Sequence, residues 1–338
     1  MVSLKDIANI CGVSVATVSK ALNGQPDISE ETRKRISDMA SELGYLANSA
    51  ARALKTNKTY NLGVLFVDEG SRGLTHEFFA AVLESFKTTA EKNGYDITFI
   101  SNCTFDSHTM SYLQHCRYRG VDGVFIVCGD FSSPQITELL YSDLPIVVLA
   151  NTIQGTPSVL SDNREGTAAL VRYAYSMGHR RIAFVHGESS VYVTRVRLDG
   201  FRSAVRELGL EVSDELILPS CYYQADLCAE NMKKLLARKD RPTCVLLPDD
   251  FSAMGALTAI HEAGLRIPDD ISIMGYDGIV LSEVTNPKIT TYRQNSEALG
   301  ATAAEMLIGV TGHPGGPVPE TVTVSGQLIP GGSVARIL

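Results

Sequence analysis

Several patterns are missing from this 338-residue chain, and each absence excludes a class of protein. No apolar run reaches the about 18 residues that a membrane-spanning helix needs, and the first residues lack the apolar core of a secretory signal. The seven cysteines are scattered, with no C-x-x-C pair and no clustered histidine, which argues against a zinc site and a disulfide framework. We therefore expect a cytoplasmic protein with reduced thiols, no metal site and no cofactor.

Common enzyme motifs are missing as well. The chain has no G-x-S-x-G elbow, no P-loop and no G-x-G-x-x-G following a strand. These absences argue against the hydrolases, nucleotide-phosphate enzymes and dehydrogenases that are built on α/β folds. We expect that the protein is not an enzyme.

The net charge of -8 is unusual for a protein that binds nucleic acid, but it is unevenly distributed. Residues 1–60 hold eight Lys and Arg against six Asp and Glu, whereas the remaining residues hold 22 against 32. A mildly basic head on an acidic body is consistent with a chain that contacts phosphate at one end only.

The head contains three short helical patterns. A serine that can cap a helix precedes each pattern and a glycine follows it, at Ser3 and Gly12, Ser14 and Gly24, and Ser29 and Gly44. The three-residue turn 12–14 joins the first two patterns with the spacing of a helix-turn-helix. Periodicity alone leaves any small three-helix bundle as the alternative.

The residues of the head favour DNA binding. They closely resemble the head of the lactose/galactose repressor (LacI/GalR) family over almost all of residues 4–55. The matching segments are Leu4–Ala8, Gly12–Lys20, Leu22–Gly24, Ser29–Thr32, Leu43–Tyr45 and Asn48–Leu54.

The resemblance implies that the second helix enters the major groove of DNA. Val15 and Ala16 would contact base edges through apolar groups only, for example at a thymine methyl. Lys20 stands where the family often has Arg, and it reaches guanine or phosphate without the two-pronged geometry of Arg. Contacts to backbone phosphates and capping are the roles expected for Lys5, Ser14, Thr17, Ser19 and Asn23.

Residues 48–55 resemble the family's hinge helix, which folds on operator DNA. The resemblance implies that Leu54 wedges into the minor groove and kinks the duplex, and Asn48 and Arg52 are further candidate DNA contacts. An ordinary linker is the alternative, because so short a helix is marginal alone.

The body alternates short apolar runs with longer helical patterns, which predicts parallel sheets covered on both faces. The candidate strands are 62–67, 95–100, 123–127, 146–149, 182–185, 243–247 and 271–274. The candidate helices are 77–93, 107–118, 163–177, 195–208, 225–237, 251–263 and 295–308. Seven strands are more than one mononucleotide-binding type of sheet contains. We therefore expect two similar lobes with a cleft between them.

Motifs of the body also resemble the LacI/GalR family, at Ser161–Asn163, Gly178–Ala183, Arg197–Phe201, Pro248–Ala256, Arg266–Ser272 and Gly275–Asp277. The family's body resembles periplasmic sugar-binding proteins, in which two lobes are linked by crossing strands, here expected near residues 160, 290 and 320. The expected fold is therefore α/β, with an all-α helix-turn-helix head and a two-lobed, doubly wound body. The expected domains are the head at 1–46, the hinge at 47–60 and the body at 61–338. Within the body, the first lobe comprises about 61–160 and 292–320, and the second about 161–290 and 321–338.

The resemblance also suggests effector-binding residues. Arg197 and Asp277 match the family's commonest effector contacts, and together they suit adjacent hydroxyls of a sugar ring. Asp249 stands where the family usually has Asn, which suggests an additional hydroxyl or amine donor in the ligand, or a repulsion against anions. The remaining candidates are Asp162 and the aromatic residues Phe78, Phe79 and Tyr223, with Tyr222 as an alternative to Tyr223.

Each candidate also has a purely structural interpretation. Arg197 would then be a surface ion pair, Asp277 a turn residue, and Phe78 and Phe79 part of the core. His76 and His186 lie near the expected cleft, but nothing local in the sequence gives them a role.

The function expected from the resemblance is that of a transcription repressor whose operator affinity is controlled by a small ligand, a sugar, bound between the lobes. A purine or nucleoside effector, or dependence on a phosphocarrier protein, is the alternative within the family. The stretch Ser190–Val193 has no Arg of the kind with which the purine branch reads a base. A transport-type sugar-binding protein is disfavoured by the head. The expected partners are pseudo-palindromic double-stranded DNA and a second copy of the chain, since no C-terminal heptads for a tetramer are present.

Overall fold

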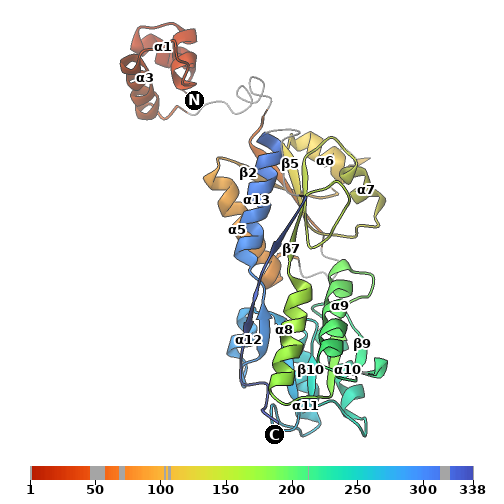
Figure 1. Cartoon of the computed structure of the whole chain (residues 1–338). Helices are drawn as coiled ribbons and strands as arrows, with labels where there is room; N and C mark the ends of the chain where they lie inside the picture. The colour runs from red at the N-terminus through yellow and green to blue at the C-terminus, as the bar shows by residue number, and fades with distance from the viewer. Residues whose placement is uncertain are drawn as a thin grey trace. The chain divides into compact units, whose positions relative to one another are not determined.

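The computed structural model describes residues 2–45, 58–67, 73–102, 104–105, 108–211, 213–312 and 320–337. The chain falls into two compact units, Met1–Thr59 and Tyr60–Leu338 (Figure 1). The hinge candidates Asn48, Arg52 and Leu54 lie outside the described residues.

The first unit is a bundle of three helices, α1 (Leu4–Cys11), α2 (Val15–Leu22) and α3 (Glu30–Glu42). The predicted caps are confirmed, because the side chains of Ser3, Ser14 and Ser29 each accept a backbone N–H three residues later. The small core of the bundle consists of Ile7, Ala8, Val18, Ala21, Ile36 and Ala40. These apolar positions recur at helical spacing, so burying them fixes how the three helices pack.

The second unit contains two six-stranded sheets, one in each lobe. The first sheet has the order β13-β7-β6-β5-β1-β2, and all its pairings are parallel. Its strands are β1 (Asn61–Phe66), β2 (Asp96–Ile100), β5 (Gly123–Cys128), β6 (Ile146–Leu149), β7 (Ser158–Ser161) and β13 (Thr321–Val324). A short hairpin of β3 (Thr104–Phe105) and β4 (His108–Thr109) lies outside this sheet.

The second sheet has the order β14-β12-β11-β10-β8-β9, and only the β12–β14 pairing within it is antiparallel. Its strands are β8 (Ile182–His186), β9 (Ile217–Pro219), β10 (Cys244–Leu246), β11 (Ser272–Asp277), β12 (Thr290–Arg293) and β14 (Gln327–Ile329). The central strands of both sheets are almost entirely buried, as expected for sheets that are covered on both faces.

Helices cover both faces of each sheet. In the first lobe, α5 (Glu77–Lys92) and α13 (Ser296–Gly312) pack side by side on one face, and α6 (Tyr112–Arg119) and α7 (Pro134–Leu140) cover the other (Figure 1). In the second lobe, α8 (Asn163–Ser176) and α9 (Tyr192–Glu207) lie opposite α10 (Ala225–Leu236) and α11 (Ala253–Glu262). The short elements are η1 (Gly73–Thr75), η2 (Asp214–Leu216) and α12 (Val280–Val284).

The chain crosses between the lobes three times, and the crossings lie a few residues later than the sequence suggested. They follow β7, β12 and β13, so they lie after Ser161, Arg293 and Val324. The expected boundary at 320 assigned Thr321–Val324 to the second lobe, but this segment pairs with Ser158–Ser161 of the first sheet. Residues 292 and 293 likewise belong to the second sheet. Strand pairing depends on distant residues, so local sequence cannot fix such a boundary.

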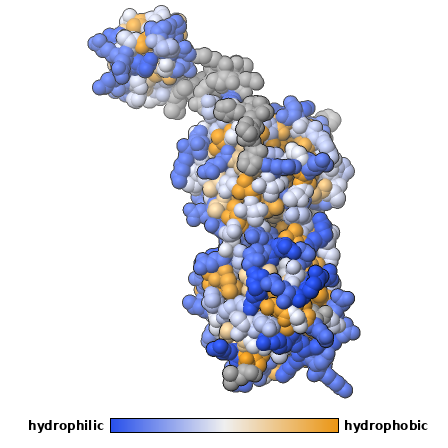
Figure 2. All heavy atoms as spheres, viewed as in Figure 1, coloured by the Kyte–Doolittle hydropathy of each residue, from blue (hydrophilic) through white to orange (hydrophobic). Residues whose placement is uncertain are grey.

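The face visible in Figure 2 is mostly hydrophilic, with hydrophobic residues in separate patches. Among the residues that the structure describes, no helix is both long enough and apolar enough to traverse a bilayer. The same residues contain no group of three or more His, Cys, Asp or Glu side chains placed to hold a metal ion.

Candidate DNA-binding and effector-binding sites

The first turn of α2 is exposed on the surface of the first unit. Val15 is 43% exposed although it is apolar, and Ala16 beside it is also exposed. The Ser14 side chain accepts the Thr17 N–H at 3.0 Å, and the two hydroxyls lie 2.8 Å apart. The capped first turn therefore presents small apolar groups outward, as the proposed contact with base edges requires.

Three further DNA candidates lie on α1 and at the C-terminal end of α2. The exposed Lys20 forms an ion pair with Asp27, and both side chains are about half exposed. This pair lowers the pKa of Asp27, chiefly through the hydrogen bond from Lys20. A surface pair of this kind contributes little stability, so a DNA phosphate can replace Asp27 at little cost. Asn23 donates to the Ser19 carbonyl, and Lys5 is exposed on α1.

In the second unit, the side chains of Arg197 and Asp277 meet in the interior. Arg197, on α9, is 5% exposed, and Asp277, at the end of β11, is 8% exposed. One Arg197 terminal nitrogen lies 3.7 Å from Asp277 Oδ1. This finding removes the surface ion pair as an interpretation of Arg197.

Further contacts fix the Arg197 guanidinium. Its Nε donates to Asn163 Oδ1 at 2.8 Å, and a terminal nitrogen donates to the Pro248 carbonyl at 2.9 Å. Its carbon lies 3.5 Å from the centre of the Tyr276 ring and 5.5 Å from that of Tyr222. The guanidinium is thus oriented by hydrogen bonds in its plane and by aromatic rings on its faces.

Gln294 also holds Asp277: its side-chain amide donates at 2.7 Å to Oδ1, the same oxygen that lies near Arg197. Burial raises the pKa of the Asp277 carboxyl to about 6, although Arg197 acts in the opposite direction. Asp277 also has a φ of +98°, and Tyr223 has a φ of +56°. Non-glycine residues with positive φ are uncommon and cluster at functional sites, so these two conformations support the candidate assignment.

Burial and neighbouring polar groups act in opposite directions on the pKa of Arg197. Burial by itself would lower the pKa of Arg197, but Tyr222, Tyr276 and Asp277 outweigh it, and the pKa is raised. Burial also raises the pKa of Asp249, and it raises that of Asp250 well above its ordinary value, with repulsion from Asp277 adding to the effect.

Asp249 has a different environment from the one the sequence suggested. Its Oδ2 accepts the Tyr223 N–H and the Ser252 hydroxyl, each at 2.8 Å, and its Oδ1 accepts the Ser252 N–H at 2.7 Å. It is 1% exposed. Both oxygens are therefore used inside the protein, and the carboxylate positions Tyr223. Asp250 similarly accepts the N–H groups of Gly278 and Ile279.

The other effector candidates are more scattered. Asp162 caps α8 by accepting the Glu165 N–H at 3.1 Å. Phe78 and Phe79 are half-buried and pack against the core of the first lobe. Tyr223 is buried and stacks on Phe251 at 4.9 Å with an angle of 5° between the rings.

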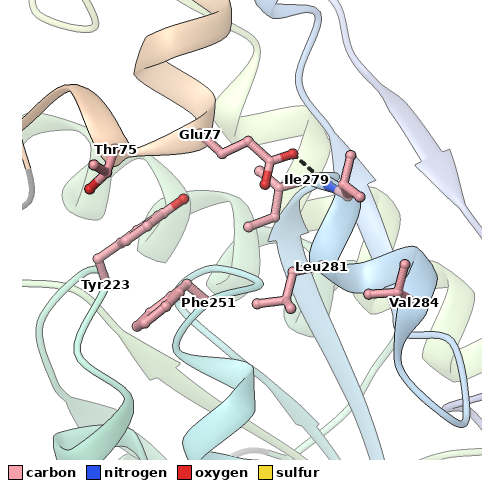
Figure 3. A pocket seen from close by; sticks show the side chains of 8 residues that line it. Thr75, Glu77, Tyr223, Phe251, Ile279, Leu281 and Val284 are labelled. Carbon is pink, nitrogen blue, oxygen red and sulfur yellow. Dashed lines mark hydrogen bonds between the residues drawn. The ribbon is translucent and has the colours of Figure 1, made fainter.

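A pocket of about 300 Å³ lies where the two lobes meet (Figure 3). Its lining residues are Thr75, Glu77, Tyr223, Phe251, Ile279, Val280, Leu281 and Val284. The lining is mostly apolar and includes neither Arg197 nor Asp277. This pocket and the buried pair are therefore separate features, with Tyr223 as the one effector candidate that lines the pocket.

Sequence reasoning missed Asn163, Gln294 and Tyr276 as neighbours of the buried pair, and it gave no role to His76. His76 lies with its ring centre 3.5 Å from that of Tyr223, at an angle of 27°. His186 hydrogen-bonds locally to the Gly187 carbonyl, and burial lowers its pKa.

Comparison with known proteins decides the family. Residues 3–48 match the model of bacterial regulatory proteins of the lacI family, and residues 171–334 match a periplasmic binding protein-like domain. The PurR repressor of Photobacterium profundum is 31% identical over 317 residues, which are 91% of each chain. The chain belongs to the LacI family. The PurR repressor of Mannheimia succiniciproducens is 30% identical over the full length of both chains.

Solved structures of LacI-family regulators have the same fold. A lac repressor dimer bound to operator and an anti-inducer has a TM-score of 0.80 at 24% identity, with 99% of each chain covered. A regulator from Enterococcus faecium with bound ribose has a TM-score of 0.70 at 27% identity, covering 82% of this chain and all of that one. The expected helix-turn-helix head and two-lobed body are confirmed. The protein is a DNA-binding transcription regulator with a ligand-binding domain, from a family of regulators that are not enzymes.

Proposed function

We propose that this LacI-family regulator is a homodimeric repressor whose affinity for a pseudo-palindromic operator is controlled by a sugar bound between its lobes. The observation that carries the proposal is the buried Arg197–Asp277 pair, with its donors and acceptors fixed beside the carboxyl ends of the second sheet. A planar donor group beside a carboxylate suits vicinal hydroxyls. The ribose-bound relative from Enterococcus faecium supports this ligand class.

The proposal assigns two sets of residues. The DNA contacts are Lys5, Ser14, Val15, Ala16, Thr17, Ser19, Lys20, Asn23, Asn48, Arg52 and Leu54. The effector contacts are Arg197, Asp277 and Tyr223, supplemented by Phe78, Phe79 and Asp162. Asp249 is assigned an indirect role, because its oxygens bind Tyr223 and Ser252.

Operator control by such a ligand requires different affinities for two conformations of the body. A ligand that binds the Arg197–Asp277 pair and reaches the first lobe favours one lobe arrangement. The DNA-bound form of the head is then favoured or disfavoured by the same free energy.

Thermal unfolding of the full-length chain with ribose, cellobiose and amino sugars, and with hypoxanthine, guanine and nucleosides, tests the ligand class. We expect a sugar to raise the unfolding midpoint, because ligand that binds only the folded state stabilises it by mass action. Arg197→Lys should abolish the increase by removing the planar donor pair, whereas the exposed Arg206→Lys on the same helix should retain it.

Stabilisation by hypoxanthine or guanine alone would replace the sugar with the second candidate, a purine-type effector. That candidate is kept because the relatives at 30–31% identity are repressors named PurR. Binding to genomic DNA fragments, measured by gel shift with and without the stabilising ligand, tests regulation. A chain that retards no symmetric promoter fragment in either state would contradict the proposed function.

A further inference from the structure

The start of α5, in the first lobe, contacts the second lobe through two adjacent residues. The ring of His76, directly before the helix, stacks on Tyr223 with ring centres 3.5 Å apart. The Glu77 carboxylate accepts the Val280 N–H at 2.7 Å, a hydrogen bond drawn in Figure 3. These contacts join segments separated by about 150 and by 203 residues along the chain.

Both partners are tied to the second lobe by further contacts. Tyr223 has its N–H bound to Asp249 and its ring parallel to that of Phe251. Val280 begins α12, directly after Ile279, whose N–H donates to the buried Asp250. Because these contacts tie both partners to the second lobe, separating the lobes would break the ring stack and the Glu77–Val280 hydrogen bond.

The first-lobe side is also anchored. The His76 ring lies 4.5 Å from Phe79, which in turn lies 5.3 Å from Phe66 of β1. A continuous line of rings therefore runs from Phe251 in the second lobe to the first strand of the first lobe. Stacked and tilted rings at these separations attract one another beyond the area they bury.

The contact between Glu77 and Val280 is a hydrogen bond and not only packing. A carboxylate that accepts a backbone N–H makes a stronger and more directional bond than a neutral acceptor does. This hydrogen bond is exposed to solvent, so water competes with it once the lobes separate. His76, by contrast, is 8% exposed, so the ring stack is the shielded part of the contact.

We infer that His76 and Glu77 form an interlobe clasp, which holds the two lobes against each other in the arrangement of this structure. The clasp consists of the His76–Tyr223 stack and the Glu77–Val280 hydrogen bond. Under the proposed function, a ligand reaches the buried Arg197–Asp277 pair only when the lobes separate. The clasp therefore determines the fraction of molecules that can bind the ligand. The clasp itself is tested without any ligand, so its failure is distinguishable from failure of the proposed effector.

Amide hydrogen exchange of the full-length, ligand-free chain measures the clasp at residues 279–284. We expect Glu77→Ala to accelerate exchange there by about fivefold or more, because opening no longer breaks a hydrogen bond. Glu77→Gln keeps a weaker, neutral carbonyl acceptor, so its exchange rate should lie between those of wild type and Glu77→Ala. Glu84→Ala is the matched control, since Glu84 lies on the same helix and forms an exposed ion pair with Lys87 one turn away.

His76 is tested by a second pair of variants. We expect His76→Ala to increase the radius of gyration from X-ray scattering and the exchange at 279–284, whereas His76→Phe, which keeps a ring on Tyr223, changes neither. If Glu77→Ala loosens the first lobe as a whole, the comparison of His76→Ala with His76→Phe still tests the clasp. Unchanged exchange in both alanine variants, or an equal acceleration in Glu84→Ala, would overturn the clasp.

Discussion

At the level of single residues, the sequence predicted the two charged partners of the proposed effector site better than the residues around them. The family motifs named Arg197 and Asp277, and the structure brings them together although they are 80 positions apart. Asn163 and Gln294 were not predicted, because an amide that orients a guanidinium or a carboxylate has no local pattern. His76 was missed for the same reason, since its partner Tyr223 lies in the other lobe.

Asp249 shows why a departure from a family pattern is ambiguous. In the sequence, a carboxylate in place of an amide suggests an additional donor in the ligand. In the structure, the Asp249 carboxylate accepts hydrogen bonds from Tyr223 and Ser252 of the protein itself. A carboxylate at this position can therefore serve contacts within the protein, including one to Tyr223 in a distant segment, and the sequence does not distinguish this role from a ligand contact.

The pH dependence of stability tests the environment of Asp277. Burial raises the pKa of this carboxyl to about 6 in the folded chain, against about 3.9 when unfolded. The folded chain thus binds this proton more tightly, so the stability Asp277 contributes is fully present below about pH 4 and is lost as the pH rises to about 6. The loss should amount to about 2–3 kcal/mol.

Urea unfolding between pH 4 and pH 7.5 checks this expectation. Asp277→Asn should lack the loss, so its free energy of unfolding relative to wild type should rise across that interval. Asp199→Asn, at an exposed position paired with Arg164, should follow the wild-type profile. A parallel profile for Asp277→Asn would show that Asp277 stays ionised down to its ordinary range.

At the level of helices and strands, the sequence predicted the elements that are marked by residues close together in the chain. The head helices were predicted with their caps, because serine, glycine and a helical stripe all lie within a few residues of one another. In the body, α7 and α12 were missed because helices of seven and five residues show too little periodicity. Strands β7, β12, β13 and β14 were anticipated only as crossings, and β9 was not predicted, since none of them has the continuous apolar run that marks β6 and β10.

Helix α2 provides the test at this scale. Ser14→Ala removes the side chain that accepts the Thr17 N–H, which should destabilise the head by about 1 kcal/mol. Amide exchange over residues 15–22 should accelerate, and operator binding should weaken, because the first turn that carries Val15 and Ala16 loosens. Ser14→Asp retains an acceptor and should preserve exchange protection. Equal protection in wild type and Ser14→Ala would mean that packing alone holds the turn.

At the level of the whole molecule, strand count predicted two lobes, and the pairing of distant strands then set their limits. The two sheets use segments from both ends of the body, with Thr321–Val324 completing the first and Gln327–Ile329 the second. Two residues separate these strands, so one short segment ties the ends of both sheets. The pairing of strands that are distant in the sequence cannot be predicted from local composition.

The residues between head and body lie outside the described ones. From the resemblance to the family we expect them to act as a hinge on the operator. A leucine wedge at the centre of the operator would kink the duplex and hold two hinge segments together on it. Leu54→Ala should therefore weaken operator binding at least about tenfold, since unstacking a base step without the wedge loses a few kcal/mol of compensating contact.

Gel shift with the selected operator measures this loss, and Leu54→Met, which retains a wedge of similar size, is the matched variant. Sedimentation should show the same dimer in wild type and Leu54→Ala, and the stabilising ligand should raise both unfolding midpoints equally, because the body is unchanged. If Leu54→Ala binds the operator like wild type, the segment acts as a plain tether. Ligand control would then have to reach the DNA through the spacing of the two heads.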